Sequence, residues 1–224
     1  VGHPALRGSS SHRGLVACTT GGVEVTVTEM NLPVAHSTLV QLLRRNAVVS
    51  QVVFALLWSL RFVSAAGAPV VAVGVLIAVA IAGALAIRIA TRAAGGMRAR
   101  DAFRTPEGRR FMRPVTWLTV AQIAGSIVVP GIAGAMGHDE WVMPLVATTI
   151  GLFLIGFGRP LQLRTVSRIG AAATLATLAL PLVAMGPALI ALTATSMIAA
   201  LLASAWCCAV AARLHTAFTL GQRG

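Results

Sequence analysis

The sequence predicts an all-α polytopic membrane protein with six transmembrane helices in three hairpins. Its 224 residues are 57% hydrophobic and 11% charged, with a mean hydropathy of +0.84, whereas soluble domains are about 45–50% apolar and about 25% charged. Six apolar runs are long enough to cross a hydrocarbon core of roughly 30 Å, which takes about 20 helical residues. The connections between the runs alternate between arginine-rich and arginine-free. These observations indicate an integral membrane protein.

The apolar runs divide the chain into a membrane domain and two tails. Residues 1–45 are polar and are predicted to form a disordered N-terminal tail, within which Met30 offers a later native start. Residues 214–224 are predicted to form a short cytoplasmic tail. The transmembrane domain of residues 46–213 then holds six predicted spans, at residues 46–67, 69–90, 114–136, 141–159, 168–186 and 188–212.

The arginines predict the orientation of the spans. All 18 basic residues are arginine, against six acids, and the net charge is +12. Short loops on the cytoplasmic side of a membrane carry an excess of basic residues. Arginines precede the first span, fill the connection at residues 92–113 and flank the connection after the fourth span, whereas the connections near residues 67, 138 and 187 have none. Both termini are therefore predicted to be cytoplasmic, which agrees with six spans.

Arg61 interrupts the apolar stretch LLWSLRFVSAAGAP and is a candidate functional residue. A mid-helix arginine costs about 2.5–3.5 kcal/mol on insertion scales, so such residues snorkel, pair or face the bundle interior. One interpretation is that Arg61 snorkels to the outer headgroups. The other is that Arg61 points into the protein with the rest of its helical face. That face also holds Ser50, Phe54, Leu57 and Ser64.

Asp139 and Glu140, in the sequence GHDEWVMP, are the only acids predicted on the outer side. They are therefore the only candidate partners for an inward-facing Arg61. We hypothesise an ion pair between Arg61 and one of these acids, which closes the outer mouth of the bundle as a gate. The alternative is that the two acids form a solvated turn at a helix N-terminus, where the helix dipole favours negative charge.

Thin polar stripes on the third and sixth spans are candidate linings of a path through the bundle. Thr119, Gln122 and Ser126 align at helical spacing on the third span, and Thr193 and Ser196 align on the sixth. Small and hydroxylated residues at this spacing usually mediate close helix packing and interhelical hydrogen bonds. Helix packing is the favoured interpretation, and a translocation path is the alternative.

The basic connection at residues 92–113 has the composition of a segment on an anionic lipid surface. A basic residue near such a surface contributes about 1 kcal/mol. Control of orientation is the favoured interpretation, and the alternative is a regulatory surface or a docking surface for a protein partner or a second copy. The large apolar content makes lipid, rather than nucleic acid, the predicted anionic partner. The predicted lipid-surface residues are Arg98, Arg100, Arg104, Arg109 and Arg110.

No pattern in the sequence indicates catalysis, a cofactor or a metal. There is no Walker loop, dinucleotide fingerprint, nucleophile elbow or HExxH motif, and the predicted spans hold no paired carboxylates. Cys207 and Cys208 have no adjacent histidine or acid to complete a ligand set. We therefore expect no enzymatic activity, cofactor or metal site.

The segment HDEWVMPLVATTIGLFLIGFGRPLQLRTVSRIGAAATLATLAL, at residues 138–180, resembles a family of small six-helix bacterial integral-membrane proteins of unknown function. The shared features are an outer His and Trp, a Pro, a Gly-centred span, a short loop after Gly and Pro, and a following span that opens near a Gly. The resemblance extends more loosely over residues 46–212. It implies the six-helix fold and a bacterial inner membrane, and it implies no activity. The acidic pair before Trp141 departs from the pattern.

Two functions are consistent with these features. The leading interpretation is a non-enzymatic structural or accessory component of the inner membrane. The alternative is a small-solute or ion permease that works as an oligomer, with Arg61, Asp139 and Glu140 as its outer gate. A continuous water-accessible cavity that joins the polar stripe of the third span to Arg61 favours transport, whereas a fully packed bundle favours the accessory role.

Overall fold

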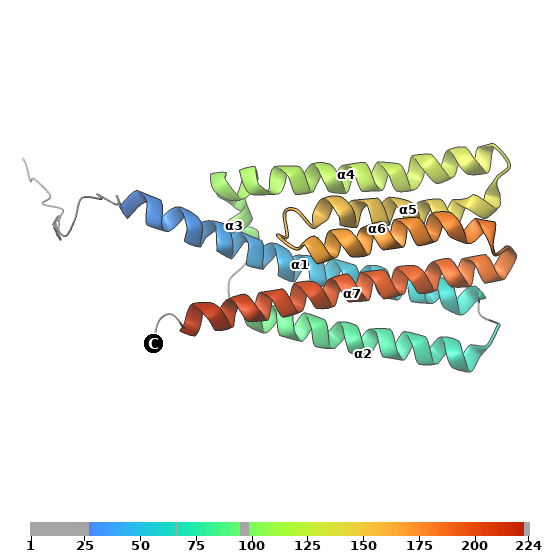
Figure 1. Cartoon of the computed structure of the whole chain (residues 1–224), viewed down its shortest axis with the longest axis horizontal. Coiled ribbons are helices and arrows are strands. Elements are labelled where there is room, and N and C mark those ends of the chain that lie inside the picture. The colour runs from blue at the N-terminus through green and yellow to red at the C-terminus, as the bar shows by residue number, and fades with distance from the viewer. Residues whose placement is uncertain (1–26, 66, 95–98, 222–224) are drawn as a thin grey trace, which may run out of the picture.

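The computed structural model of the protein describes residues 27–65, 67–94 and 99–221, and the regular secondary structure of these residues is helical throughout. Six helices are long and apolar enough to cross a membrane, which confirms the predicted fold class. The elements, in order, are α1 (Val27–Ala65), α2 (Pro69–Ala93), α3 (Ala99–Arg104), α4 (Pro106–Ala135), α5 (Asp139–Phe157), α6 (Arg164–Ala179), the 3-10 turn η1 (Leu180–Leu182) and α7 (Gly186–Gly221) (Figure 1).

The six long helices form the three predicted hairpins, α1–α2, α4–α5 and α6–α7 (Figure 1). Helices α1, α2 and α7 pack against one another as one group, and α4, α5 and α6 form a second group in which α5 is central. The groups meet where α7 contacts α6 and α5. Helix α4 packs mainly on α5, whereas α1 packs mainly on α7 and α2.

Each of the three hairpin turns contains a glycine with a positive φ angle. Gly67, Gly137 and Gly186 have φ values of +59°, +81° and +57°, in the left-handed region. Glycine adopts this conformation without the clash that a Cβ atom introduces. Each glycine lies in one of the arginine-free connections, so the same residue type reverses the chain between the two helices of every hairpin.

Helices α1 and α7 extend into both segments that were predicted to be tails. The prediction that residues 27–45 belong to a disordered tail was wrong, because α1 begins at Val27. Polar side chains near residue 41 lower the local hydropathy, but Gln41 and Arg44 are buried and bond to the backbone of α7. The predicted C-terminal tail begins within a helix, because α7 continues past residue 214 to Gly221. Residues 1–26 lie outside the described residues.

The basic connection is more structured than predicted. It contains the short helix α3 and the first turns of α4, which begins at Pro106 rather than at residue 114. Thr105 is the N-cap of α4, and its side chain accepts a hydrogen bond from the Gly108 N–H at 3.0 Å. A hydroxyl N-cap followed by proline in the first turn is a typical helix start.

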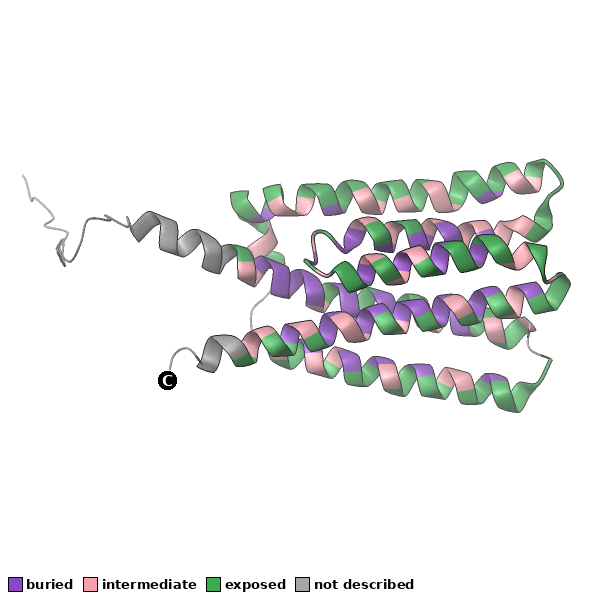
Figure 2. Ribbon diagram, in the orientation of Figure 1, coloured by how far each residue is buried: buried purple, intermediate pink, exposed green. Residues whose placement is uncertain are grey.

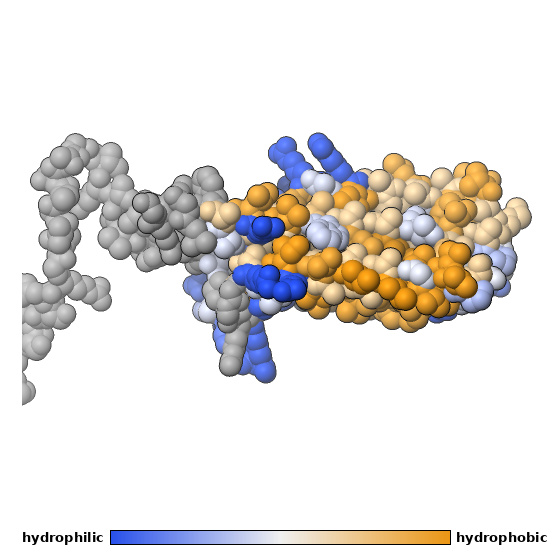
Figure 3. All heavy atoms as spheres, turned by 90° about the horizontal axis from the view of Figure 1, so that it is seen from below, coloured by the Kyte–Doolittle hydropathy of each residue, from blue (hydrophilic) through white to orange (hydrophobic). Residues whose placement is uncertain are grey.

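The core lies along the contact between α1 and α7 (Figure 2). Helix α7 buries Ala194, Met197, Leu201 and Ala205 at intervals of three or four residues, as expected for one helical face. Helix α4 is the least buried of the six long helices, and Figure 2 shows exposed residues along most of its length. The apolar surface in Figure 3 covers the part of the bundle away from the most hydrophilic side chains, as a membrane-spanning body requires.

Candidate functional site

Arg61 is exposed on the outside of the bundle. All the residues of its predicted inward face, Ser50, Phe54, Leu57 and Ser64, are also exposed. The interpretation that this face points into the protein was therefore wrong. The reason is that α1 turns the opposite face toward α7, and this buried face includes Val48, Gln51, Ala55 and Ser59.

The structure does not bring Arg61 together with the two outer acids. Asp139 and Glu140 are exposed in the first turn of α5, and Glu140 Oε1 lies 3.6 Å from His138 Nδ1. Among the described residues, Arg61 forms no ion pair. The hypothesised Arg61 gate is absent from this arrangement, whereas acids in the first turn of α5 suit the helix dipole.

Replacing Arg61 with glutamine is expected to change the free energy of unfolding by less than about 0.5 kcal/mol, as for most surface substitutions. The physical reason is that the guanidinium is exposed and has no acidic partner within the described part of the chain. Thermal unfolding in detergent checks this, with Asp139→Asn as the matched variant at the other proposed member of the pair. A large loss that is restored by combining Arg61→Glu with Glu140→Arg contradicts it.

The predicted polar stripes separate into two kinds of residue. Ser126 and Thr149 join α4 to α5 through a hydroxyl hydrogen bond of 2.7 Å. On α7, Ser196 donates to the Thr193 carbonyl, and Thr193 is buried with no hydrogen-bond partner for its own hydroxyl among the described residues. Ser126, Thr193 and Ser196 therefore belong to the packed part of the bundle. Thr119 and Gln122 instead line a cavity.

That cavity is the α1–α4 groove, which has a volume of about 320 Å³. Its walls come from α1 and α4, its floor comes from α5, and Leu201 contributes from α7. Five of its sixteen lining residues have uncharged polar side chains, and none is charged. The polar five are Asn46, Ser50, Gln51, Thr119 and Gln122. The groove therefore combines an apolar body with neutral hydrogen-bonding groups, which is typical of small-molecule pockets.

Gln51 is the most constrained polar residue of the groove. Its side chain is 3% exposed, and its Nε2 donates to Ser204 Oγ on α7 at 2.9 Å. Its Oε1 is buried and has no hydrogen-bond partner among the described residues. Rotating the amide exchanges the two atoms and leaves an N–H group unsatisfied instead. An unsatisfied buried polar group costs about 1–3 kcal/mol. A hydrogen bond from a bound molecule to the Gln51 amide would therefore be favourable.

Sequence reasoning missed Gln51, although a signal for it exists. Gln41, Arg44, Val48, Gln51 and Ala55 recur at intervals of three or four residues, and all five are buried. Polar residues on a transmembrane helix usually face other helices, where they find hydrogen bonds. A search for the face of α1 with polar and small residues, rather than for the face of Arg61, identifies the buried side.

The predicted lipid-surface arginines lie at one end of the bundle. Arg100, Arg104, Arg109 and Arg110 are exposed on α3 and the first turns of α4, and Arg98 lies outside the described residues. Figure 3 shows strongly hydrophilic side chains gathered toward one end of the molecule and apolar side chains beyond them. We call the end of the bundle that carries these arginines the basic end.

No family model, curated protein or solved structure matches this chain. Within the part of the chain that the structure describes, there is also no group of three or more His, Cys, Asp or Glu side chains that could hold a metal ion. Cys207 and Cys208 are free thiols on α7. The groove and the charges of the basic end are therefore the candidate functional features of the protein.

Proposed function

We propose that this protein is a non-enzymatic component of a bacterial inner membrane that binds a neutral amphipathic molecule in the α1–α4 groove. The single observation that carries this proposal is a largely apolar groove lined by Gln51, whose buried Oε1 has no hydrogen-bond partner among the described residues. The distribution of arginines supports cytoplasmic termini. The six helices that are long and apolar enough to cross a bilayer support the membrane assignment.

The position of the groove supports binding within the bilayer. Gln51 lies seven residues from Arg44, which corresponds to about 10 Å along a helix. At this depth, side-chain amides have no water to bond with, and leaving them unsatisfied is costly. Gln122 has no hydrogen-bond partner among the described residues either. A bound molecule with a hydroxyl or amide group satisfies these side chains.

The lining also restricts the chemistry of the ligand. Without a charged side chain in the groove, a charged headgroup loses its hydration and gains no compensating ion pair. Phe153 and Phe157 stack at 4.9 Å between ring centroids and provide an apolar surface on α5. The groove therefore fits an apolar chain or ring that carries a neutral donor and acceptor.

The extent of the groove supports binding over the permease alternative. The groove is lined by Thr119 and Gln122 but not by Ser126, which is already bonded to Thr149. Arg61, near the other end of α1, is not part of its lining either. A path for a solute needs polar side chains across the whole bilayer. The polar side chains of the groove are confined to the half of the bundle nearer the basic end.

Binding is tested by thermal unfolding of the purified protein with three probes of equal chain length. Dodecanol offers a neutral hydroxyl, dodecane offers none, and dodecanoate offers a charge. We expect dodecanol to raise the unfolding temperature and the other two to raise it less, because only the alcohol satisfies Gln51 and Gln122 without burying a charge. We expect Gln122→Leu to remove the difference between dodecanol and dodecane.

The control is Thr116→Val, which lies on the same helix, is exposed, and bonds only to its own helix. It is expected to retain the full response to dodecanol. Gln51→Leu provides a second groove variant, although it also removes the bond to Ser204. Equal stabilisation by dodecane and dodecanol in the unsubstituted protein, or an unchanged preference in Gln122→Leu, contradicts the proposal.

A further inference from the structure

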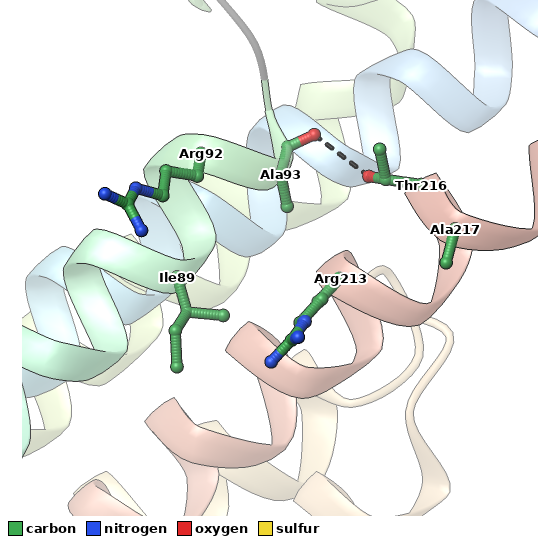
Figure 4. A pocket seen from close by; sticks show the side chains of 6 residues that line it. All are labelled: Ile89, Arg92, Ala93, Arg213, Thr216 and Ala217. Carbon is green, nitrogen blue, oxygen red and sulfur yellow. Dashed lines mark hydrogen bonds between the residues drawn. The ribbon is translucent and has the colours of Figure 1, made fainter. Parts of the chain in front are cut away.

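Two separate pockets at the basic end share the same construction. The first, the α2–α7 pocket, has a volume of about 450 Å³ and is lined by Ile89, Arg92, Ala93, Arg213, Thr216 and Ala217 (Figure 4). The Thr216 hydroxyl donates to the Ala93 carbonyl at 3.1 Å, which ties the last turn of α2 to α7. Figure 4 shows this hydrogen bond at one edge of the pocket, with Arg92 projecting from α2 and Arg213 from α7.

The second, the α4–α5 pocket, has a volume of about 550 Å³. Arg110 on α4 and Arg159 after α5 supply its charges, and Phe111, Pro114 and Leu118 supply an apolar wall. Gly156 lies at the same wall, where the absence of a side chain lets Leu118 approach α5. Like the first pocket, it therefore places two arginines from different segments beside an apolar surface.

The charges of the four arginines in these pockets are not neutralised by acidic side chains of the described residues. Arg92, Arg110, Arg159 and Arg213 are exposed, and none forms an ion pair with a described residue. No acid lines either pocket. The planar guanidinium presents paired N–H donors that match the oxygen atoms of a phosphate, so the arginines that line each pocket offer donors to a phosphate group.

We propose that the α2–α7 and α4–α5 pockets each bind the phosphate of an anionic phospholipid, whose acyl chains lie along the adjacent apolar wall. The apolar walls distinguish a lipid from a soluble phosphate compound, because Ile89 in one pocket and Leu118 in the other continue into the apolar surface of a long helix. Basic pockets between transmembrane helices bind lipid headgroups in this way. This inference is independent of the ligand proposed for the α1–α4 groove.

Native mass spectrometry of the purified protein with added phosphatidylglycerol or phosphatidylcholine tests the proposal. We expect the protein to retain phosphatidylglycerol in preference to phosphatidylcholine. We expect the paired variant Arg92→Gln/Arg213→Gln to weaken one binding event about 30-fold, from the loss of two basic contacts. The other paired variant, Arg110→Gln/Arg159→Gln, is expected to weaken the other event by a similar factor.

The matched control is Arg164→Gln/Arg168→Gln, which removes the same charge from exposed positions on α6 outside both pockets. It is expected to weaken binding less than about threefold, as a diffuse charge effect does. Each paired variant leaves the other pocket unchanged. Lipid binding at that unchanged pocket shows that the variant is folded. An equal loss in the α6 control, or no preference for phosphatidylglycerol in the unsubstituted protein, overturns the proposal.

Discussion

Replacing Gly170 with alanine is expected to lower the free energy of unfolding by about 2–3 kcal/mol, as overpacking of a close contact does. A Cβ atom on Gly170 meets three atoms of α5: the Gly151 carbonyl oxygen at 2.7 Å, the Ile155 nitrogen at 2.7 Å and the Leu154 Cβ at 2.8 Å. Two of these are backbone atoms, so no side-chain rotation relieves the clash. The two helices must move apart.

The separation of α5 and α6 also weakens polar contacts along the same line. The Thr148 and Thr177 hydroxyl groups are hydrogen-bonded across these two helices at 3.0 Å, and both residues are buried. Small residues let membrane helices approach closely enough for such bonds and for extensive van der Waals contact. The expected loss of stability therefore includes these α5–α6 contacts as well as the clash of the added methyl group.

Gly74→Ala on α2 is the control for this prediction. A Cβ atom at Gly74 has no atom within 4 Å outside its own local backbone, and Gly74 is helical and exposed. We expect its stability to be unchanged or slightly raised, because alanine is the better helix former. Unfolding in mixed micelles with increasing sodium dodecyl sulfate measures both variants. Equal stability of Gly170→Ala and Gly74→Ala contradicts a close α5–α6 contact at Gly170.

The six spans were predictable because each depends on a local property of the chain. A helix that crosses a bilayer needs a long apolar run, and the three arginine-free turns interrupt these runs visibly at Gly67, Gly137 and Gly186. The boundaries at the basic end were less predictable. There, α1 and α7 extend past the apolar runs and are held by contacts with each other, which hydropathy does not report.

The inward face of α1 was not predictable from apolar periodicity. In water, the apolar face of a helix is the buried one, but lipid is as apolar as the protein interior. The exposed face of α1 carries Phe54 and Leu57, while the buried face carries Gln51, Ala55 and Ser59. The informative residues are therefore the polar and small ones, and Arg61 was misleading because one exposed charge near a helix end does not mark an interior face.

The groove was only half predictable for a related reason. Thr119 and Gln122 are recognisable as a stripe on one helix, but their neighbours Asn46, Ser50 and Gln51 come from a helix more than sixty residues earlier. The stripe alone does not reveal that Ser126, one turn further along α4, is already satisfied by Thr149. Which polar side chain is free to bind a ligand depends on packing between hairpins.

Replacing Arg44 with alanine is expected to lower the free energy of unfolding by about 3 kcal/mol, since hydrogen bonds of a charged donor contribute about 1.5–3 kcal/mol and their loss leaves the buried Leu161 carbonyl without this donor. Arg44 is 8% exposed, its Nε donates to the Leu161 carbonyl at 3.1 Å, and its Nη1 donates to the Ala211 carbonyl at 3.4 Å. One side chain of α1 thus holds both the connection after α5 and helix α7.

Arg44 joins the two groups of helices at the basic end, so we expect its replacement to have a larger effect than that of an exposed arginine. Leu161 follows the end of α5, where the carbonyl end of the helix dipole favours a cation. Arg44→Lys is expected to recover part of the loss, because a lysine keeps the charge but cannot reproduce the forked donors. Arg88→Ala, at an exposed position on α2, is the control and is expected to have little effect. Detergent unfolding measures the three variants, and a stability of Arg44→Ala equal to that of Arg88→Ala contradicts a structural role for this buried guanidinium.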